Sequence, residues 1–325
     1  MKSSIRPVLL ASVAVLSWST VATAFKVALQ SMTTFEMLFV ACATALIIFT
    51  VWMLATGSWH ELRLFTPSIW LRFGFLGLIA PVTYYLMLFK SYDLLPAQIA
   101  QPINYIWPIL LAILIAVVER KPIPKCKYLG MVVSLSGVVF ISLGGSAISG
   151  SISIGGILLS IISAMLWGLY WIVNDSLKSK VSEIPALFMT FLFGMIYLFI
   201  GNVFEPIGHL EIKSMLAGIY IGAFEMGIPF ICFGMAIRET NNPALINQMC
   251  YLAPFLSLFF ISIILKEQII ATTYVGLILI IGGIIYNQYF AGKTVTRKRS
   301  HEKSSQDLHT ENSQLQHQAS NLKTQ

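Results

Sequence analysis

Ten long apolar segments constrain what this chain can fold into. Each is close to the roughly 20 residues that a helix needs to cross the hydrocarbon core of a bilayer. They cover residues 7–29, 34–56, 68–89, 93–118, 126–144, 152–173, 184–204, 213–237, 241–265 and 271–291. A transmembrane barrel would instead show alternating segments of about ten residues. The sequence therefore predicts an all-α membrane protein with ten transmembrane helices.

Charged residues are too few for a soluble protein of this length. They make up 11% of the 325 residues, whereas a soluble domain carries about a quarter. The net charge of +7 is spread over short patches between the apolar segments and over the end of the chain, so no basic face can follow a nucleic-acid backbone. The four cysteines form no CxxC pair and predict neither a disulfide framework nor a zinc site. The lipid bilayer is the expected partner, and nucleic acid is not.

The Lys and Arg residues predict the orientation of the helices, because such residues favour the cytoplasmic side of a membrane. With the amino terminus in the cytoplasm, 17 of the 21 fall in cytoplasmic segments and Lys26 falls within a span; Lys90, Lys213 and Lys266 lie on the opposite side. Both termini are therefore expected in the cytoplasm. The first apolar segment is longer than the core of a signal peptide, which has about 7–15 residues, and is interpreted as the first spanning helix.

The two halves of the sequence resemble each other. Positions 146 to 149 residues apart share their residue type, which pairs Trp18 with Trp167, Tyr105 with Tyr251, Pro108 with Pro254, Gly130 with Gly276 and Gly137 with Gly283. We expect residues 1–146 to form a first five-helix repeat and residues 147–292 a second. Residues 293–325 are polar and are expected to form a disordered cytoplasmic tail.

An odd number of spans in each repeat predicts that the second repeat enters the membrane upside down. Such inverted repeats provide two opposite arrangements around one site near the midplane, which is what alternating access requires. The duplication therefore favours a transporter over an anchored scaffold, which has no need of it.

These features together resemble the EamA-type transporters of the drug/metabolite transporter superfamily. The resemblance covers residues 7–291 and rests on the ten spans, the five-plus-five repeat, Trp18, and the prolines and glycines of matching spans. The stretch Asn104-Tyr105-Ile106-Trp107-Pro108 also looks like the aromatic amino-acid exporter subgroup. The resemblance implies a secondary transporter of a bacterial inner membrane that exports small metabolites, namely amino acids or related amphiphilic compounds.

Prolines interrupt spans four and nine and leave backbone carbonyls without their helical partners. Pro102 and Pro108 do so in span four, and Pro254 does so in span nine. In lipid, such carbonyls are tolerated where protein, water or ligand satisfies them, so these helices are predicted to line a polar central cavity. The alternative is that their polar side chains join neighbouring helices. The predicted substrate-binding residues are Gln101, Asn104, Tyr105, Trp107, Gln248, Tyr251, Trp18, Trp167 and Lys26.

Two charged residues inside the spans have candidate roles. Glu225 lies in the middle of span eight, four residues before Pro229, and a carboxylate at that depth is costly unless it is protonated or paired. It is the predicted proton-coupling residue or the partner of a substrate ammonium; the alternative is a protonated Glu that joins two helices. Lys26 is predicted either to hold a substrate carboxylate or to pair with Glu36.

No cofactor or metal is expected, because the sequence has no P-loop, metal-ligand cluster or nucleophile–base set. A rival function is the transport of a nucleotide-linked sugar or an adenosyl compound, but a doubly anionic solute would need several central cations. A second rival is a membrane-embedded enzyme, which would need paired titratable groups deep in the membrane. The expected partners are a small-molecule solute and the bilayer, with a second copy of the chain as a candidate homodimer partner.

Overall fold

The computed structural model describes residues 5–289, except for 119, 121–122, 124, 150–151, 178–180 and 209. The described residues are helical and contain no strand, and they include ten helices that are long and apolar enough to cross a membrane. The all-α fold with ten spans is therefore confirmed. The tail predicted over residues 293–325 lies outside the described residues.

The first half of the chain supplies five of these spans. They are α1 (Arg6–Ala28), α2 (Thr34–Thr56), α3 (Pro67–Gly77) with α4 (Tyr84–Leu94), α5 (Ala97–Asn104) with α6 (Trp107–Val118), and α7 (Lys125–Ser149). The second half supplies α8 (Ile154–Asp175), α9 (Glu183–Gly201), α10 (Ile212–Ile221) with α11 (Ile228–Glu239), and α12 (Pro243–Met249) with α13 (Leu252–Phe260). A last helix covers Ala271–Tyr289.

Four spans are interrupted near their middles, at corresponding places in the two halves. The third span has a π-helical turn over Leu78–Thr83, and the eighth has one over Gly222–Gly227. The fourth span breaks between α5 and α6, and the ninth between α12 and α13. Proline accounts for these interruptions, because it cannot donate to the carbonyl four residues earlier.

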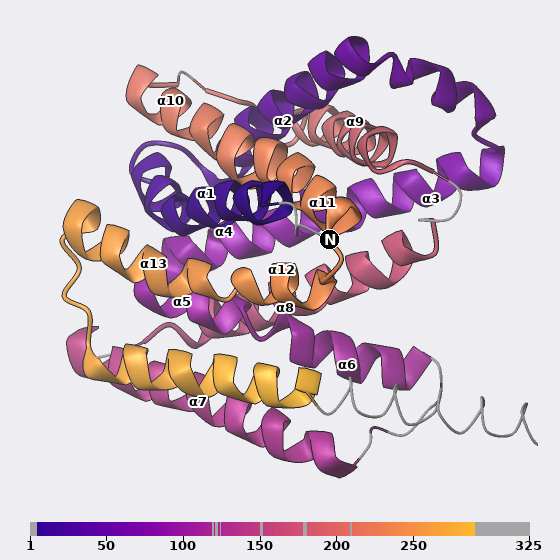
Figure 1. Ribbon diagram of the computed structural model, residues 1–325. Helices are drawn as coiled ribbons and strands as arrows, with labels where there is room; N and C mark the ends of the chain where they lie inside the picture. Colours follow the sequence, from indigo (N-terminus) through magenta and orange to yellow (C-terminus); the bar gives the residue numbers. More distant parts are fainter. Residues whose placement is uncertain are drawn as a thin grey trace, which may run out of the picture.

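The fifth and tenth spans approach closely along matching glycines. A Cβ atom at Gly130 would lie 2.6 Å from the carbonyl oxygen of Gly283, and one at Gly137 would lie 2.5 Å from that of Gly276. Ser134 Oγ also donates to the Ile280 carbonyl over 2.9 Å. Small residues therefore allow these two backbones to meet, as in other membrane helix pairs. Figure 1 shows α7 beside the C-terminal helix, drawn in yellow, on the side of the bundle away from α2 and α9.

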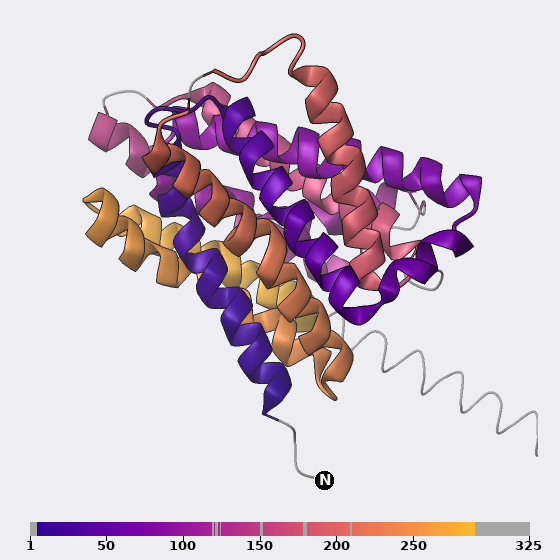
Figure 2. The same ribbon diagram turned by 90° about the horizontal axis from the view of Figure 1, so that it is seen from above.

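The helices are apolar on the faces that point outward as well as inward. In α2, Leu38, Ala45 and Phe49 are fully buried, whereas Ile47 and Leu54 are 63% and 65% exposed. A helix that is hydrophobic all round fits a membrane span, because lipid covers the face that other helices leave open. Figure 2 shows α1, drawn in indigo, running beside the orange α10 and α11, which brings the first span against the interruption in the eighth.

Candidate functional site

Glu225 occupies the π-helical turn at the middle of the eighth span. Its Oε1 atom accepts a hydrogen bond of 3.2 Å from the hydroxyl of Tyr85 in α4. Its backbone carbonyl, which Pro229 leaves without a helical donor, accepts one of 3.2 Å from Trp18 Nε1 in α1. One residue thus joins three spans, and the residue as a whole keeps part of its surface accessible although it lies mid-span.

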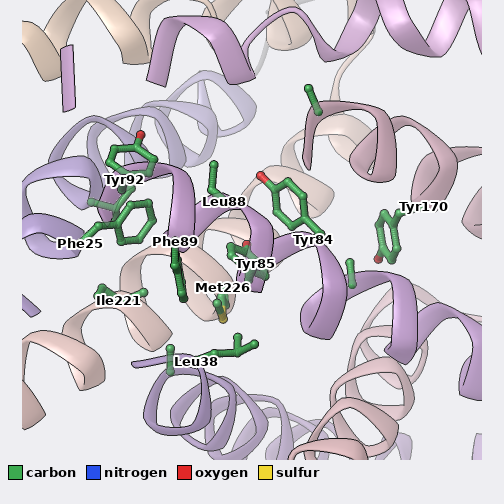
Figure 3. Close-up of a cluster of buried hydrophobic side chains, with 14 of the residues drawn as sticks. Phe25, Leu38, Tyr84, Tyr85, Leu88, Phe89, Tyr92, Tyr170, Ile221 and Met226 are labelled. Carbon is green, nitrogen blue, oxygen red and sulfur yellow. The ribbon is translucent and has the colours of Figure 1, made fainter. Parts of the chain in front are cut away.

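Five aromatic rings form a continuous chain beside this carboxylate, and we call them the aromatic cluster: Trp18, Phe230, Trp167, Tyr84 and Tyr85. Their successive centroids lie 6.2, 5.9, 4.9 and 4.6 Å apart in that order. Tyr84 and Tyr85 are buried, whereas the other three keep part of their surface accessible. Figure 3 shows Tyr84 and Tyr85 next to each other on α4, with Tyr85 close to Met226.

The aromatic cluster offers two kinds of interaction to a ligand. Ring faces stack on planar groups, and they attract cations, the latter more strongly away from water. A carboxylate accepts hydrogen bonds from an ammonium group or takes up a proton. The centre of the bundle therefore combines one carboxylate with several aromatic rings.

Asn104 connects the aromatic cluster to span four. Its Oδ1 accepts from the Tyr84 hydroxyl over 3.5 Å, and its Nδ2 donates to Ser163 Oγ over 2.8 Å. Trp107 lies at the edge of the cluster, because it stacks at 6.4 Å on Trp171, which in turn lies 5.9 Å from Trp167. The structure thus brings four sequence-predicted residues together with Glu225: Trp18, Asn104, Trp107 and Trp167.

Of the remaining candidates of spans four and nine, Tyr105 lies near Tyr84 and Glu225, whereas Gln101 and Tyr251 bond to other helices. Gln101 is 5% exposed and accepts a hydrogen bond from Ser257 in α13, and Tyr251 accepts one from Gln288 in the last helix. Gln248 is exposed, and Tyr105 is half-buried at the break between α5 and α6. In this conformation Gln101 and Tyr251 make the contacts that the packing alternative predicts. Their roles in solute binding stay predictions.

Lys26 lies at one end of the bundle, which we call the Lys26 end. Its Nζ donates to the carbonyls of Tyr92 and Leu95 over 2.8 and 3.1 Å. The predicted pairing with Glu36 is wrong, because that carboxylate accepts from the backbone of Thr33 in a capping box and from that of Gly208. A cavity of about 290 Å³ opens beside Lys26, whereas the sequence predicted a polar cavity at the centre.

Three buried rings separate the Lys26 end from the aromatic cluster, and we call them the aromatic plug: Phe25, Phe89 and Tyr92. Phe89 lies 5.4 Å from Tyr85 and 4.9 Å from Phe25, which lies 5.1 Å from Tyr92. All three are at most 2% exposed. Figure 3 shows Tyr92, Phe25 and Phe89 together, with Phe89 nearest to Tyr85. The aromatic plug is thus a closely packed group of rings between Lys26 and the aromatic cluster.

A second closure at the Lys26 end joins the two halves of the chain. Glu267, in the segment after span nine, accepts from the backbone nitrogens of Ala97 and Gln98 over 3.2 and 3.4 Å. Gln98 Nε2 donates to the Gln268 carbonyl over 3.0 Å, and its Oε1 accepts from the backbone nitrogen of Ile270 over 3.2 Å. The opposite end carries exposed ion pairs, including Arg6 with Glu239 at 3.4 Å.

Sequence reasoning missed Tyr85, Phe230 and Glu267 as members of these arrangements. By its position near the end of a predicted span, Tyr85 could be interpreted as an aromatic residue of the membrane interface. It lies four residues after Pro81, however, which is the proline of the interruption in span three. Phe230 directly follows Pro229. Glu267 comes two residues after the last residue of an apolar span, where a carboxylate can reach the exposed N–H groups that begin another helix. These positions relative to proline and to the span ends were the available signals.

Comparison with known proteins identifies the family. The profile of the EamA-like transporter family matches the chain twice, over residues 5–143 and 154–287. The chain belongs to this family. The two matches cover nearly all of the described residues, and the EamA family together with the ten spans makes the chain an integral membrane transporter.

Relatives of this EamA protein are transporters by name. An "Uncharacterized transporter" of Clostridium kluyveri is 28% identical over 174 residues, which are 52% of this chain and 56% of that protein. The "Uncharacterized transporter YvbV" of Bacillus subtilis is 24% identical over 231 residues, 69% of this chain and 73% of that protein. The chain thus spans little more than half the length of the Clostridium relative. These names give no solute, so the amino-acid exporter subgroup stays a prediction.

One solved crystal structure of a protein has the same fold. It is 21% identical with a TM-score of 0.63, and the match covers 90% of this chain and 99% of that chain. At this level of identity the likeness concerns the arrangement of the helices alone.

Proposed function

We propose that this transporter exports small amphiphilic metabolites, amino acids or related compounds, and binds them between Glu225 and the aromatic cluster. The observation that carries the proposal is the carboxylate at mid-span, which is bonded to Tyr85 at one end of the aromatic cluster, while Trp18 at the other end bonds the carbonyl of the same residue. A solute ammonium would bind the carboxylate, while its apolar or aromatic body would lie on the rings. A cation over an aromatic face gains about 0.5–2 kcal/mol, more when desolvated.

Glu225 is the proposed proton-coupling residue. The carboxylate neutralises either a proton or a solute ammonium, because a charge inside the membrane requires a partner. Tyr85, which donates to the same carboxylate over 3.2 Å, would keep its position during the exchange. Entry of a proton would then release the solute, so that inward proton flow drives outward solute flow.

The two halves of the chain are proposed to move as inverted repeats around this site. Support comes from the double match to the family profile and from the interruptions that recur in spans three and eight and in spans four and nine. In this conformation the Lys26 end is closed by the aromatic plug and by Glu267, while Gln248 near the opposite end is exposed. Rocking of the halves would bring Gln101, Tyr105, Gln248 and Tyr251 toward the solute.

The termini are proposed to face the cytoplasm, which places the Lys26 end outside. The support is the excess of Lys and Arg in the segments on the amino-terminal side. The conformation described here would then be closed toward the outside.

Reconstitution tests the proposed function directly. Purified protein in liposomes is loaded with labelled amino acids, one at a time, and efflux is measured with and without an imposed proton gradient; protein-free liposomes are the control. We expect saturable efflux of one or more apolar or aromatic amino acids, accelerated when the gradient drives protons against the solute. Efflux that is absent across the amino-acid panel, with transport of a nucleotide-linked sugar instead, contradicts the proposal.

A further inference from the structure

The cavity at the Lys26 end has the composition of a binding site for a small zwitterion. It measures about 290 Å³ and is lined by Lys26, Leu29, Gln30, Asp93, Leu265 and Glu267. One ammonium, two carboxylates, one amide and two apolar side chains therefore face the same space. Ligand sites commonly measure about 300–1,000 Å³, so this cavity suits a solute as small as a single amino acid.

The charged groups of the cavity keep binding capacity after their contacts within the protein. A lysine ammonium has three N–H donors, and Lys26 directs two of them to the carbonyls of Tyr92 and Leu95. Asp93 accepts from Lys90 through Oδ2 over 2.6 Å, and a carboxylate has a second oxygen that can accept. An anion could thus bind Lys26 while a cation binds Asp93 a short distance away.

Lys26 and Glu267 also have a structural role. The ammonium lies at the carboxyl end of α4 and the carboxylate at the amino end of α5, where such charges stabilise helix termini. This capping explains their contacts with the backbone. It does not account for a cavity of this size between them, nor for Leu29 and Leu265 in its wall.

We propose that this cavity is an exit site that holds a zwitterionic solute after it passes the aromatic plug. The solute carboxylate binds Lys26, its ammonium binds Asp93 and Glu267, and its apolar side chain lies against Leu29 and Leu265. The solute class rests on the proposed function. The cavity adds what the aromatic cluster lacks, a cation for the carboxylate end of an amino acid.

Protection of a cysteine at the mouth of the cavity tests this exit site. Gln30 is exposed and lines the cavity, so Gln30→Cys is introduced after the four native cysteines have been replaced. A membrane-impermeant maleimide is applied outside intact cells, with leucine, leucinamide or 4-methylpentanoate as the probe. Leucine carries both charges, leucinamide lacks the carboxylate, and 4-methylpentanoate lacks the ammonium.

We expect leucine to slow the labelling at least fivefold, and each of the other two probes to slow it less than twofold. Lys26→Met should abolish the protection by leucine, whereas Lys213→Met, an exposed lysine outside the cavity on the same side, should keep it. Lys26→Arg keeps the cation and should restore at least part of the protection. Thermal unfolding of each variant in detergent verifies that it folds.

Equal labelling with and without leucine overturns the exit site, as does equal protection by all three probes. Failure of the exit site and of the proposed function are distinguishable, because the liposome assay measures transport independently. If amino acids are transported but leucine does not protect Gln30→Cys, the exit site is excluded and the proposed site at Glu225 stands. If leucine protects Gln30→Cys but no amino acid is transported, the cavity binds a zwitterion and the proposed function is wrong.

Discussion

Glu225 and Lys26 both lie inside apolar spans, and the fold surrounds them in opposite ways. Glu225, at mid-span, has a single tyrosine hydroxyl on its carboxylate and aromatic rings beside it. Lys26, near the end of α1, has two backbone carbonyls on its ammonium and carboxylates across a cavity. The carboxylate thus keeps most of its binding capacity, whereas most of the ammonium's capacity is used by the protein.

This difference indicates what each position contributes. A charge with few protein partners depends on a proton or a ligand for its neutralisation, so Glu225 suits a step in which binding partners are exchanged. A charge that caps a helix end is held in place, so Lys26 suits a fixed wall of a site. The aromatic plug of Phe25, Phe89 and Tyr92 separates the two environments.

Removing the plug ring that is nearest to Tyr85 should have the largest effect on stability. Phe89 is fully buried and contacts both Phe25 and Tyr85. Truncation of a buried Phe to Ala costs about 3–5 kcal/mol in protein cores, so Phe89→Ala should lower the midpoint of thermal unfolding markedly. Phe259→Ala, at a phenylalanine that is 61% exposed, is the matched control and should change it little. Equal shifts in the two variants would mean that Phe89 contributes no more to stability than an exposed phenylalanine, and that the plug is not a tightly packed barrier between the two environments.

Neutralising the central carboxylate should have the next largest effect, and this effect should be on transport. A hydrogen bond to a charged group contributes about 1.5–3 kcal/mol, so Glu225→Gln should slow efflux roughly 10- to 100-fold and abolish its response to an imposed proton gradient. Glu205→Gln changes an exposed carboxylate in the same way and should leave efflux unchanged. Normal proton dependence of Glu225→Gln would exclude this residue from coupling.

Removing one ring of the aromatic cluster should weaken solute binding to a smaller degree. Trp167 stacks on Tyr84 and Phe230 with centroid distances of 4.9 and 5.9 Å. Loss of a cation–ring contact of about 0.5–2 kcal/mol predicts that Trp167→Leu raises the KM of efflux about 2- to 30-fold with a smaller change in maximal rate. Trp70→Leu, on the outer surface of α3, should leave KM unaltered. A similar KM for both variants would place the solute elsewhere.

Weakening the closure at the Lys26 end should have the smallest effect. Glu267→Gln removes a negative charge from the amino end of α5, where such a charge contributes about 0.3–1 kcal/mol. A cysteine placed at Ser91, a buried position of α4 between Phe89 and Tyr92, leaves the plug rings in place and should react about two- to fivefold faster in this variant with an impermeant reagent added outside. The same cysteine with Lys266→Gln, which changes the neighbouring residue, is the control. Unaltered reactivity with Glu267→Gln would exclude this carboxylate from the closure.

The fold was predictable from the sequence because lipid imposes one simple rule on span length. Hydropathy predicted ten spans that the structure confirms, and the prolines predicted the breaks near Pro108 and Pro254. The spacing of Gly130 and Gly137 indicated close packing, which occurs against Gly276 and Gly283. Each of these signals depends on local chemistry alone.

The site was less predictable because it depends on how each helix is rotated about its axis. Gln101 and Asn104 are three residues apart on α5, yet one bonds Ser257 and the other lies beside Tyr84. In an apolar span the hydrophobic pattern carries little information on which face points inward. The error at Lys26 was avoidable, because Thr33 and Glu36 have the spacing of a capping box, which already uses that carboxylate.

The central claim is that solute binds at mid-span, between Glu225 and the aromatic cluster. A structure determined by cryo-electron microscopy with the solute that the liposome assay identifies tests this claim most directly. We predict density beside Trp18 and Trp167, with a solute nitrogen within hydrogen-bond distance of the Glu225 carboxylate. Solute density between Gln248 and Tyr251, with Glu225 still bonded only to Tyr85, would contradict the account.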